Sequence, residues 1–296
     1  MFKTGIKCGY NAAYNTVMHD GVELSGYLAF LSLLSLFPFL VFIVAIAGMI
    51  GQGESGATLI NYVLQHLPNH ITFALRPRIE EIVSGPPQGL LTISIIGAIW
   101  TASSAVEGLR TVLNRAYHVH TPPAYIFRRL LSIVQMMLFA FILVVVMLAH
   151  VFIPLVLQHI SNIIGLDMAN SYQAAWDKAS RYLIPLVLFI IISFLYYLLP
   201  NIKQRFVSVA PGALVVAFGL MGTTYLLTLY LSKFNQVNLI YGSLGGVIAA
   251  LLFAYISNLL FIFGAELNYQ IVKAIGMRVV EKEKVSPPIE EQPQER

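Results

Sequence analysis

The sequence predicts an all-α, polytopic membrane protein, and two features of the chain support this fold class. Hydrophobic residues make up 57% of the 296 residues and charged residues only 11%, whereas a soluble domain carries about 25% charged residues. The chain also contains six long, mostly apolar runs without Asp, Glu, Lys or Arg, and a helix needs about 20 apolar residues to cross a bilayer core. This composition excludes a disordered chain and argues against a soluble globular protein. A β-barrel is disfavoured because its strands alternate in hydropathy, whereas these runs are continuously apolar.

The six runs predict six transmembrane helices in a single domain, residues 1–272. We expect the helices at about residues 25–50, 89–107, 130–156, 182–200, 208–231 and 242–268. The first run is too long for the apolar core of a cleavable signal peptide, so we expect it to stay in the membrane. We expect the third span to end near Pro154, because polar residues follow it. Residues 273–296 are charged and proline-bearing, which predicts a disordered tail.

Amphipathic segments are expected outside the spans. Residues 2–19 place apolar side chains at helical spacing, which is typical of a helix that lies on the membrane interface. A soluble helix packed on the loops is the alternative. The outer loops carry weaker patterns of the same kind, which predict short amphipathic helices at about residues 59–67, 71–83 and 171–181.

The distribution of basic residues predicts the orientation of the chain. Most of the 18 Lys and Arg residues fall in the N-terminal segment, in the loops after the second and fourth spans, and in the tail. Because cytoplasmic loops are enriched in Lys and Arg, both termini are expected in the cytoplasm. An even number of spans agrees with this placement.

Five short motifs, taken in order, carry a resemblance to a known family. They are LSLFP at 34–38, LP at 199–200, PGA at 211–213, YGSLGG at 241–246 and GAEL at 264–267. As a set they resemble the YihY/BrkB family of bacterial inner-membrane proteins, over residues 15–272. The resemblance implies a six-helix protein of the bacterial inner membrane with cytoplasmic termini. It also implies roles linked to serum resistance, to export of lipopolysaccharide or lipid and, through an old label, to ribonuclease BN.

Charged residues at the cytoplasmic ends of the spans are the candidate binding residues. Glu266 closes a long uncharged run, and a carboxylate at membrane depth is costly unless it is paired or hydrated. We interpret it either as a proton or headgroup site, or as a helix-end carboxylate that reaches the interface or pairs with a nearby arginine. The other candidates for binding a substrate or headgroup are Glu107, Arg110, Arg128, Lys203 and Arg205. Alternatively, such basic residues only fix topology and attract anionic lipid non-specifically.

Proline, glycine and histidine residues provide further candidates. Pro38 predicts a kink in the first span, and Gly242 and Gly246 permit either close helix packing or a hinge. A lone histidine in a span, such as His150, usually forms a hydrogen bond to a neighbouring helix. The pair His118-Val-His120 lacks a third ligand at a useful spacing, so we predict neither a metal site nor a cofactor.

The function predicted from these features is transport or handling of a lipid-like amphiphile, with membrane lipids as partners. The chain contains no HxxEH, DxD or G-x-S-x-G motif and a single cysteine, so we expect no catalytic residues, no enzyme activity and no nucleic-acid partner. The alternative is a non-catalytic membrane scaffold whose outer loops bind an envelope protein. A ribonuclease is a remote alternative.

Overall fold

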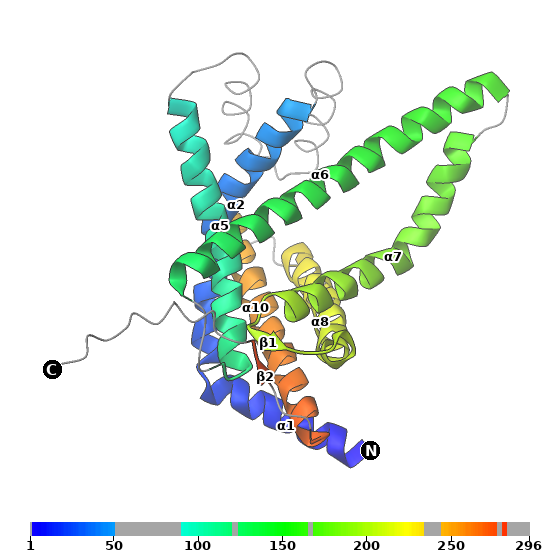
Figure 1. Ribbon diagram of the computed structural model, residues 1–296. Coiled ribbons are helices and arrows are strands. Elements are labelled where there is room, and N and C mark those ends of the chain that lie inside the picture. The colour runs from blue at the N-terminus through cyan, green and yellow to red at the C-terminus, as the bar shows by residue number, and fades with distance from the viewer. Residues whose placement is uncertain are drawn as a thin grey trace.

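Six long helices fall on the six predicted spans in the computed structural model (Figure 1). The structure describes residues 2–50, 90–119, 124–164, 168–233, 244–276 and 280–282. The long helices are α2 (Gly21–Ile50), α5 (Leu90–Ala116), α6 (Tyr125–Ile164), α7 (Met168–Leu198), α8 (Phe206–Lys233) and α10 (Leu244–Ala274). The remaining elements are helix α1 (Phe2–Met18) and the two-residue strands β1 (Ile202–Lys203) and β2 (Val280–Glu281). The predicted all-α class is thus confirmed.

Three helical stretches among the described residues are long and apolar enough to cross a membrane. They are Tyr125–Val145, Phe206–Tyr230 and Gly245–Ala274. Shorter apolar helical stretches cover Gly21–Leu36 and Leu183–Leu198. The protein is therefore built of membrane-type helices, while the count of six crossings stays a prediction.

Helices α6 and α7 are longer than predicted, with 40 and 31 residues. The separate helix expected at 171–181 is wrong, because α7 begins at Met168 and continues without a break into the fourth predicted span. Likewise α6 passes through the polar residues after Pro154 and ends at Ile164. Polar residues limit the apolar part of a helix, but they do not end its backbone hydrogen bonding. Hydropathy therefore located the apolar core of each helix but made both helices too short.

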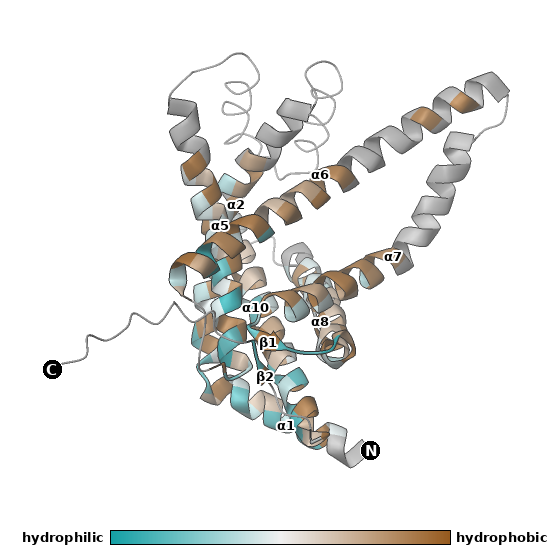
Figure 2. Cartoon of the chain, viewed as in Figure 1, coloured by the Kyte–Doolittle hydropathy of each residue, from teal (hydrophilic) through white to brown (hydrophobic). Residues whose placement is uncertain are grey.

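Helix α10 lies at the centre of the arrangement and contacts α8, α2, α1 and α5 (Figure 1). Helix α2 packs along α5, and α7 packs along α8. Helices α6 and α7 diverge from α2 and α5 toward the upper right of the view (Figure 1). Hydrophilic residues concentrate around α1, β1, β2 and the adjacent part of α5, whereas hydrophobic residues follow α6 and α7 (Figure 2). We call the end that holds α1, β1 and β2 the polar end.

Two glycines allow α8 and α10 to cross at very short distance. A Cβ atom on Gly212 would overlap the carbonyl oxygen of Gly264, and a Cβ atom on Gly264 would overlap Val216 and the hydroxyl of Tyr196. Asn268 fastens the crossing, because its Oδ1 accepts a hydrogen bond from the Gly212 amide at 2.7 Å. The PGA and GAEL motifs therefore have a packing role, as expected for small residues between membrane helices.

Helix α1 packs one face on α10 and leaves an apolar face exposed. Cys8 and Ala12 are buried against Leu267, whereas Ile6 and Tyr10, which belong to the predicted apolar stripe, are 61% and 72% exposed. The stripe thus points away from the helices that α1 contacts. An exposed apolar face suits a helix at a membrane interface, which stays a prediction.

Several other predictions meet the structure only in part. Helix α2 continues through Pro38, and Gly246 lies exposed in the first turn of α10. Gly242 and the segments 59–67 and 71–83 lie outside the described residues, as does the side chain of His150.

The disordered tail was predicted to begin at residue 273, which is earlier than the structure allows. Helix α10 runs to Ala274, and β2 pairs antiparallel with β1, Ile202 opposite Glu281 and Lys203 opposite Val280.

Candidate functional site

The turn between α7 and α8 carries Lys203 and Arg205, and buried polar groups hold it in place. Arg110 of α5 donates from Nη1 to the carbonyl of Leu199 at 3.1 Å. One turn further along α5, the side-chain oxygen of Asn114 accepts a hydrogen bond from the Asn201 amide at 2.8 Å. Both α5 residues are buried, so the position of the turn is fixed from the helix bundle.

The end of the chain also fastens this turn. The backbone amide of Lys282 donates to the carbonyl of Asn201 at 3.1 Å, and its Nζ donates to the carbonyl of Pro200 at 3.2 Å. Partial burial of the ammonium group and the nearby Arg110 guanidinium lower the pKa of Lys282. Lys282 therefore holds the end of the described chain against the α7–α8 turn.

A cavity of about 930 Å³ opens beside this turn, and we call it the basic cavity. Lys203 and Arg205 line it from the turn, and Tyr117 lines it from the end of α5. Burial raises the pKa of the Tyr117 phenol, which therefore stays protonated. Most of the other lining residues are apolar: Ile202, Val207, Pro211, Ile271, Val272, Ile275 and Val280. The cavity thus combines an apolar wall with two cationic side chains.

Behind the turn, one buried carboxylate interacts with two arginines. Glu107 lies 3.5 Å from the Nε of Arg110, three residues along α5, and 3.6 Å from the Nε of Arg128 on α6. Ser132 donates to Glu107 at 2.8 Å, and Gln135 accepts from Nη2 of Arg110. Because two guanidinium groups share one carboxylate, the network carries a surplus positive charge.

A further arginine extends this positive region along α6. Arg129 is 6% exposed, and its guanidinium carbon lies 4.1 Å from the centre of the Trp100 ring. Its Nη2 donates to the Ser104 hydroxyl at 3.1 Å and to the carbonyl of Trp100. A cation over an indole face is a stabilising contact. Sequence reasoning did not choose Arg129 as a binding residue, although its spacing from Ser132 and Gln135 marks a polar stripe at the start of an apolar helix.

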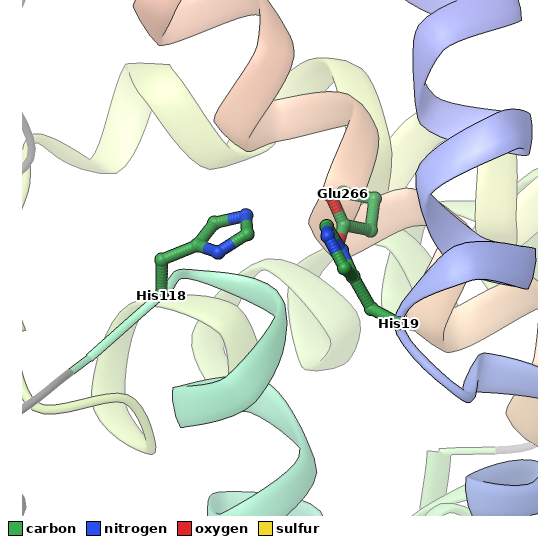
Figure 3. Close-up of side chains that lie close together, drawn as sticks. All are labelled: His19, His118 and Glu266. Atoms are coloured by element: carbon green, nitrogen blue, oxygen red, sulfur yellow. The ribbon is translucent and has the colours of Figure 1, made fainter.

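Glu266 lies in a separate cluster with two histidines at the polar end (Figure 3). Its Oε1 is 3.0 Å from Nδ1 of His19, in the α1–α2 turn. His118, just after α5, lies with its ring 4.8 Å from the His19 ring and 4.5 Å from the Tyr269 ring, centre to centre. Asn15 of α1 also lies beside the carboxylate. Among the described residues, the ion-pair partner of Glu266 is His19 rather than an arginine.

The structure therefore divides the six predicted binding residues into three groups. Glu107, Arg110 and Arg128 form the buried network, Lys203 and Arg205 line the basic cavity, and Glu266 joins the histidine cluster. The first two groups are linked, because Arg110 holds the turn that carries Lys203 and Arg205. Sequence reasoning missed His19, because no local pattern connects it with His118 and Glu266, which lie far from it in the sequence.

These features define a polytopic α-helical membrane protein with a basic, amphipathic cavity at its polar end. The chain belongs to the BrkB family: it matches the family described as "Virulence factor BrkB" over residues 12–287. The resemblance read from the five motifs is thus confirmed. The chain is also 31% identical over 210 residues to a Bacillus subtilis (strain 168) protein named ribonuclease-like protein YfkH, covering 71% of this chain and 76% of that protein. No solved structure matches the chain significantly.

Proposed function

We propose that this protein binds an anionic, lipid-like amphiphile in the basic cavity and moves or handles it at the bacterial inner membrane. The observation that supports the proposal is the pairing of an apolar wall with Lys203 and Arg205 in one cavity of about 930 Å³. Ligand pockets typically measure about 300–1,000 Å³ and are mostly apolar, with a few placed polar groups. An acyl chain fits the wall, and a phosphate or carboxylate headgroup fits the two cations.

The electrostatics around the cavity favour an anion. The buried network behind the turn has more guanidinium groups than carboxylates. A basic residue close to a membrane surface contributes about 1 kcal/mol to the attraction of anionic lipid. Lys203 and Arg205 together would therefore favour an anionic lipid over a zwitterionic one by about 2 kcal/mol.

The proposal includes a sidedness, with the polar end and both termini in the cytoplasm. It is supported by the bias of Lys and Arg toward the polar-end loops. The exposed apolar residues of α1 would then lie on the inner leaflet. A reporter fused after residue 296 should be active in the cytoplasm of intact cells. If the fusion is instead reachable from the periplasm, the proposed sidedness is wrong.

The test compares retained lipid between two double variants. The full-length protein is placed in nanodiscs of mixed phosphatidylglycerol and phosphatidylcholine, re-extracted, and its bound lipid is measured by mass spectrometry. Lys203→Glu with Arg205→Glu should lower the ratio of anionic to zwitterionic lipid at least about tenfold. Lys7→Glu with Lys273→Glu changes the net charge equally at two exposed positions outside the cavity lining. This control should keep the wild-type ratio.

Two outcomes contradict the proposal. If the cavity variant and the control retain lipid equally, the cavity is not the anion site. If the wild-type protein binds anionic lipid but does not move a fluorescent analogue across the membrane of proteoliposomes, the scaffold alternative replaces transport.

The ribonuclease-like name of the Bacillus subtilis relative describes that protein. The proposal predicts that the purified wild-type chain leaves RNA intact.

A further inference from the structure

We propose that His19, His118 and Glu266 form a binding site for a divalent transition metal such as Zn²⁺. One ligand atom from each residue lies within 4.8 Å of the other two. Two imidazoles and one carboxylate form a set that such ions use, leaving a further coordination position open. The site goes beyond the proposed lipid function and does not depend on it.

The three side chains converge from separate parts of the fold (Figure 3). His19 lies between α1 and α2, His118 directly follows α5, and Glu266 is on the buried side of α10. Zinc bonds of about 2.0–2.1 Å place tetrahedral ligand atoms roughly 3.4 Å apart. The 3.0 Å between His19 Nδ1 and Glu266 Oε1 already suits two ligands of one ion. His118 has to move on the order of 1 Å to complete the set.

The carboxylate of Glu266 is under-satisfied without a cation. Glu266 is 1% exposed, and its Oε2 atom accepts no hydrogen bond, although Asn15 lies nearby. Its ion-pair partner among the described residues is His19, which carries charge only when protonated. A buried carboxylate with an unpaired oxygen is costly. A bound dication would supply both the missing charge and the missing contact.

A small space adjoins the carboxylate on the side away from His118. This cavity of about 10 Å³ is lined by His19, Glu266 and Arg115 but not by His118, and about this volume is the minimum for one water molecule. Arg115 forms an ion pair with Asp20, which reduces its repulsion of a cation. A metal here would join α1, α5 and α10 at the polar end.

The backbone of His118 provides a clean variant. His118 has φ +54°, in the left-handed region. At this end of α5, the His118 amide donates to the carbonyl of Arg115, and the Val119 amide donates to the carbonyl of Asn114. Helix ends of this kind favour glycine. His118→Gly therefore removes the imidazole and relieves the backbone at the same time. The second variant, Glu266→Gln, keeps the side-chain volume and removes the charge.

The experiment uses the full-length protein in detergent, with any affinity tag removed, and titrates Zn²⁺ and Co²⁺. The wild-type chain should bind one equivalent, give the visible spectrum of four-coordinate Co²⁺, and show a raised thermal midpoint with Zn²⁺. His118→Gly and Glu266→Gln should each weaken this binding at least tenfold and lose the thermal shift. His120→Gln is the matched control and should bind as the wild type does.

Three results would overturn the proposal. Binding by the wild type that is no tighter than binding by His118→Gly means that His19 and Glu266 form only an ion pair. Loss of binding in His120→Gln together with retention in Glu266→Gln assigns the metal to the His118-Val-His120 segment instead. A well-folded wild-type protein with no bound equivalent rejects the site outright. None of these results depends on whether the basic cavity binds lipid.

Discussion

Replacing Gly212 with alanine should disrupt the close crossing of α8 and α10. The added Cβ would overlap the backbone carbonyl of Gly264, which cannot rotate away. Ordinary contact begins near 3.4 Å, so α8 and α10 must separate by on the order of 1 Å, enough to forfeit a quarter to a half of each dispersion contact across the gap. The substitution also displaces Asn268, which accepts from Gly212 and donates to the carbonyl of Val209 at 3.1 Å.

The expected loss of stability follows from three contributions. Overpacking costs about 1–3 kcal/mol, and each of the two Asn268 hydrogen bonds is worth about 0.5–1.5 kcal/mol. Alanine returns about 1 kcal/mol through its higher helix propensity. The net loss in the free energy of unfolding for Gly212→Ala is therefore about 3 kcal/mol.

The same change elsewhere on α8 provides the comparison. A Cβ on Gly222 meets nothing within 4 Å, so Gly222→Ala should be neutral or stabilising by up to about 1 kcal/mol. Gly219→Ala should fall between them, because its Cβ would lie 3.0 Å from a flexible methyl group of Leu260. Unfolding by sodium dodecyl sulfate in mixed micelles measures the series. Equal stability of Gly212→Ala and Gly222→Ala would refute the close crossing.

Two further predictions concern the groups around the α7–α8 turn. Glu107→Gln leaves the buried guanidiniums of Arg110 and Arg128 without their carboxylate, so the same unfolding assay should show a loss of about 3–5 kcal/mol; a loss below 1 kcal/mol would contradict the role of Glu107. Lys282→Ala removes the hydrogen bond to Pro200 and should speed hydrogen exchange of the amides at 280–282. The exposed control Lys273→Ala should leave that exchange unchanged, and equal exchange in both variants would contradict the role of Lys282 in holding this segment to the turn.

The fold was largely predictable from the sequence because membrane helices are long apolar runs. Each predicted span coincides with a helix, since the absence of charge over about 20 residues is a strong local signal. The ends of α6 and α7 were not predictable from hydropathy, because polar residues such as Gln158 continue a helix outside its apolar part. The strand pair at 202–203 and 280–281 was missed as well, since two-residue strands carry no periodicity.

The candidate site was predictable by residue type but not by grouping. Glu107 and Arg110 are three residues apart on one helix, so their contact follows from sequence. Their contact with Arg128 depends on how α5 packs on α6, and the meeting of His19 with Glu266 depends on how α1 and α2 pack on α10. Charge at the ends of spans therefore identified most of the polar residues, whereas tertiary structure decided which of them act together.

A high-resolution structure in lipid would test the proposed binding of an amphiphile most directly. The proposal predicts ordered acyl density along the apolar wall of the basic cavity, with its headgroup within hydrogen-bond distance of Lys203 or Arg205. Density for lipid elsewhere on the protein, with the cavity holding only water or a segment of the chain itself, would contradict it.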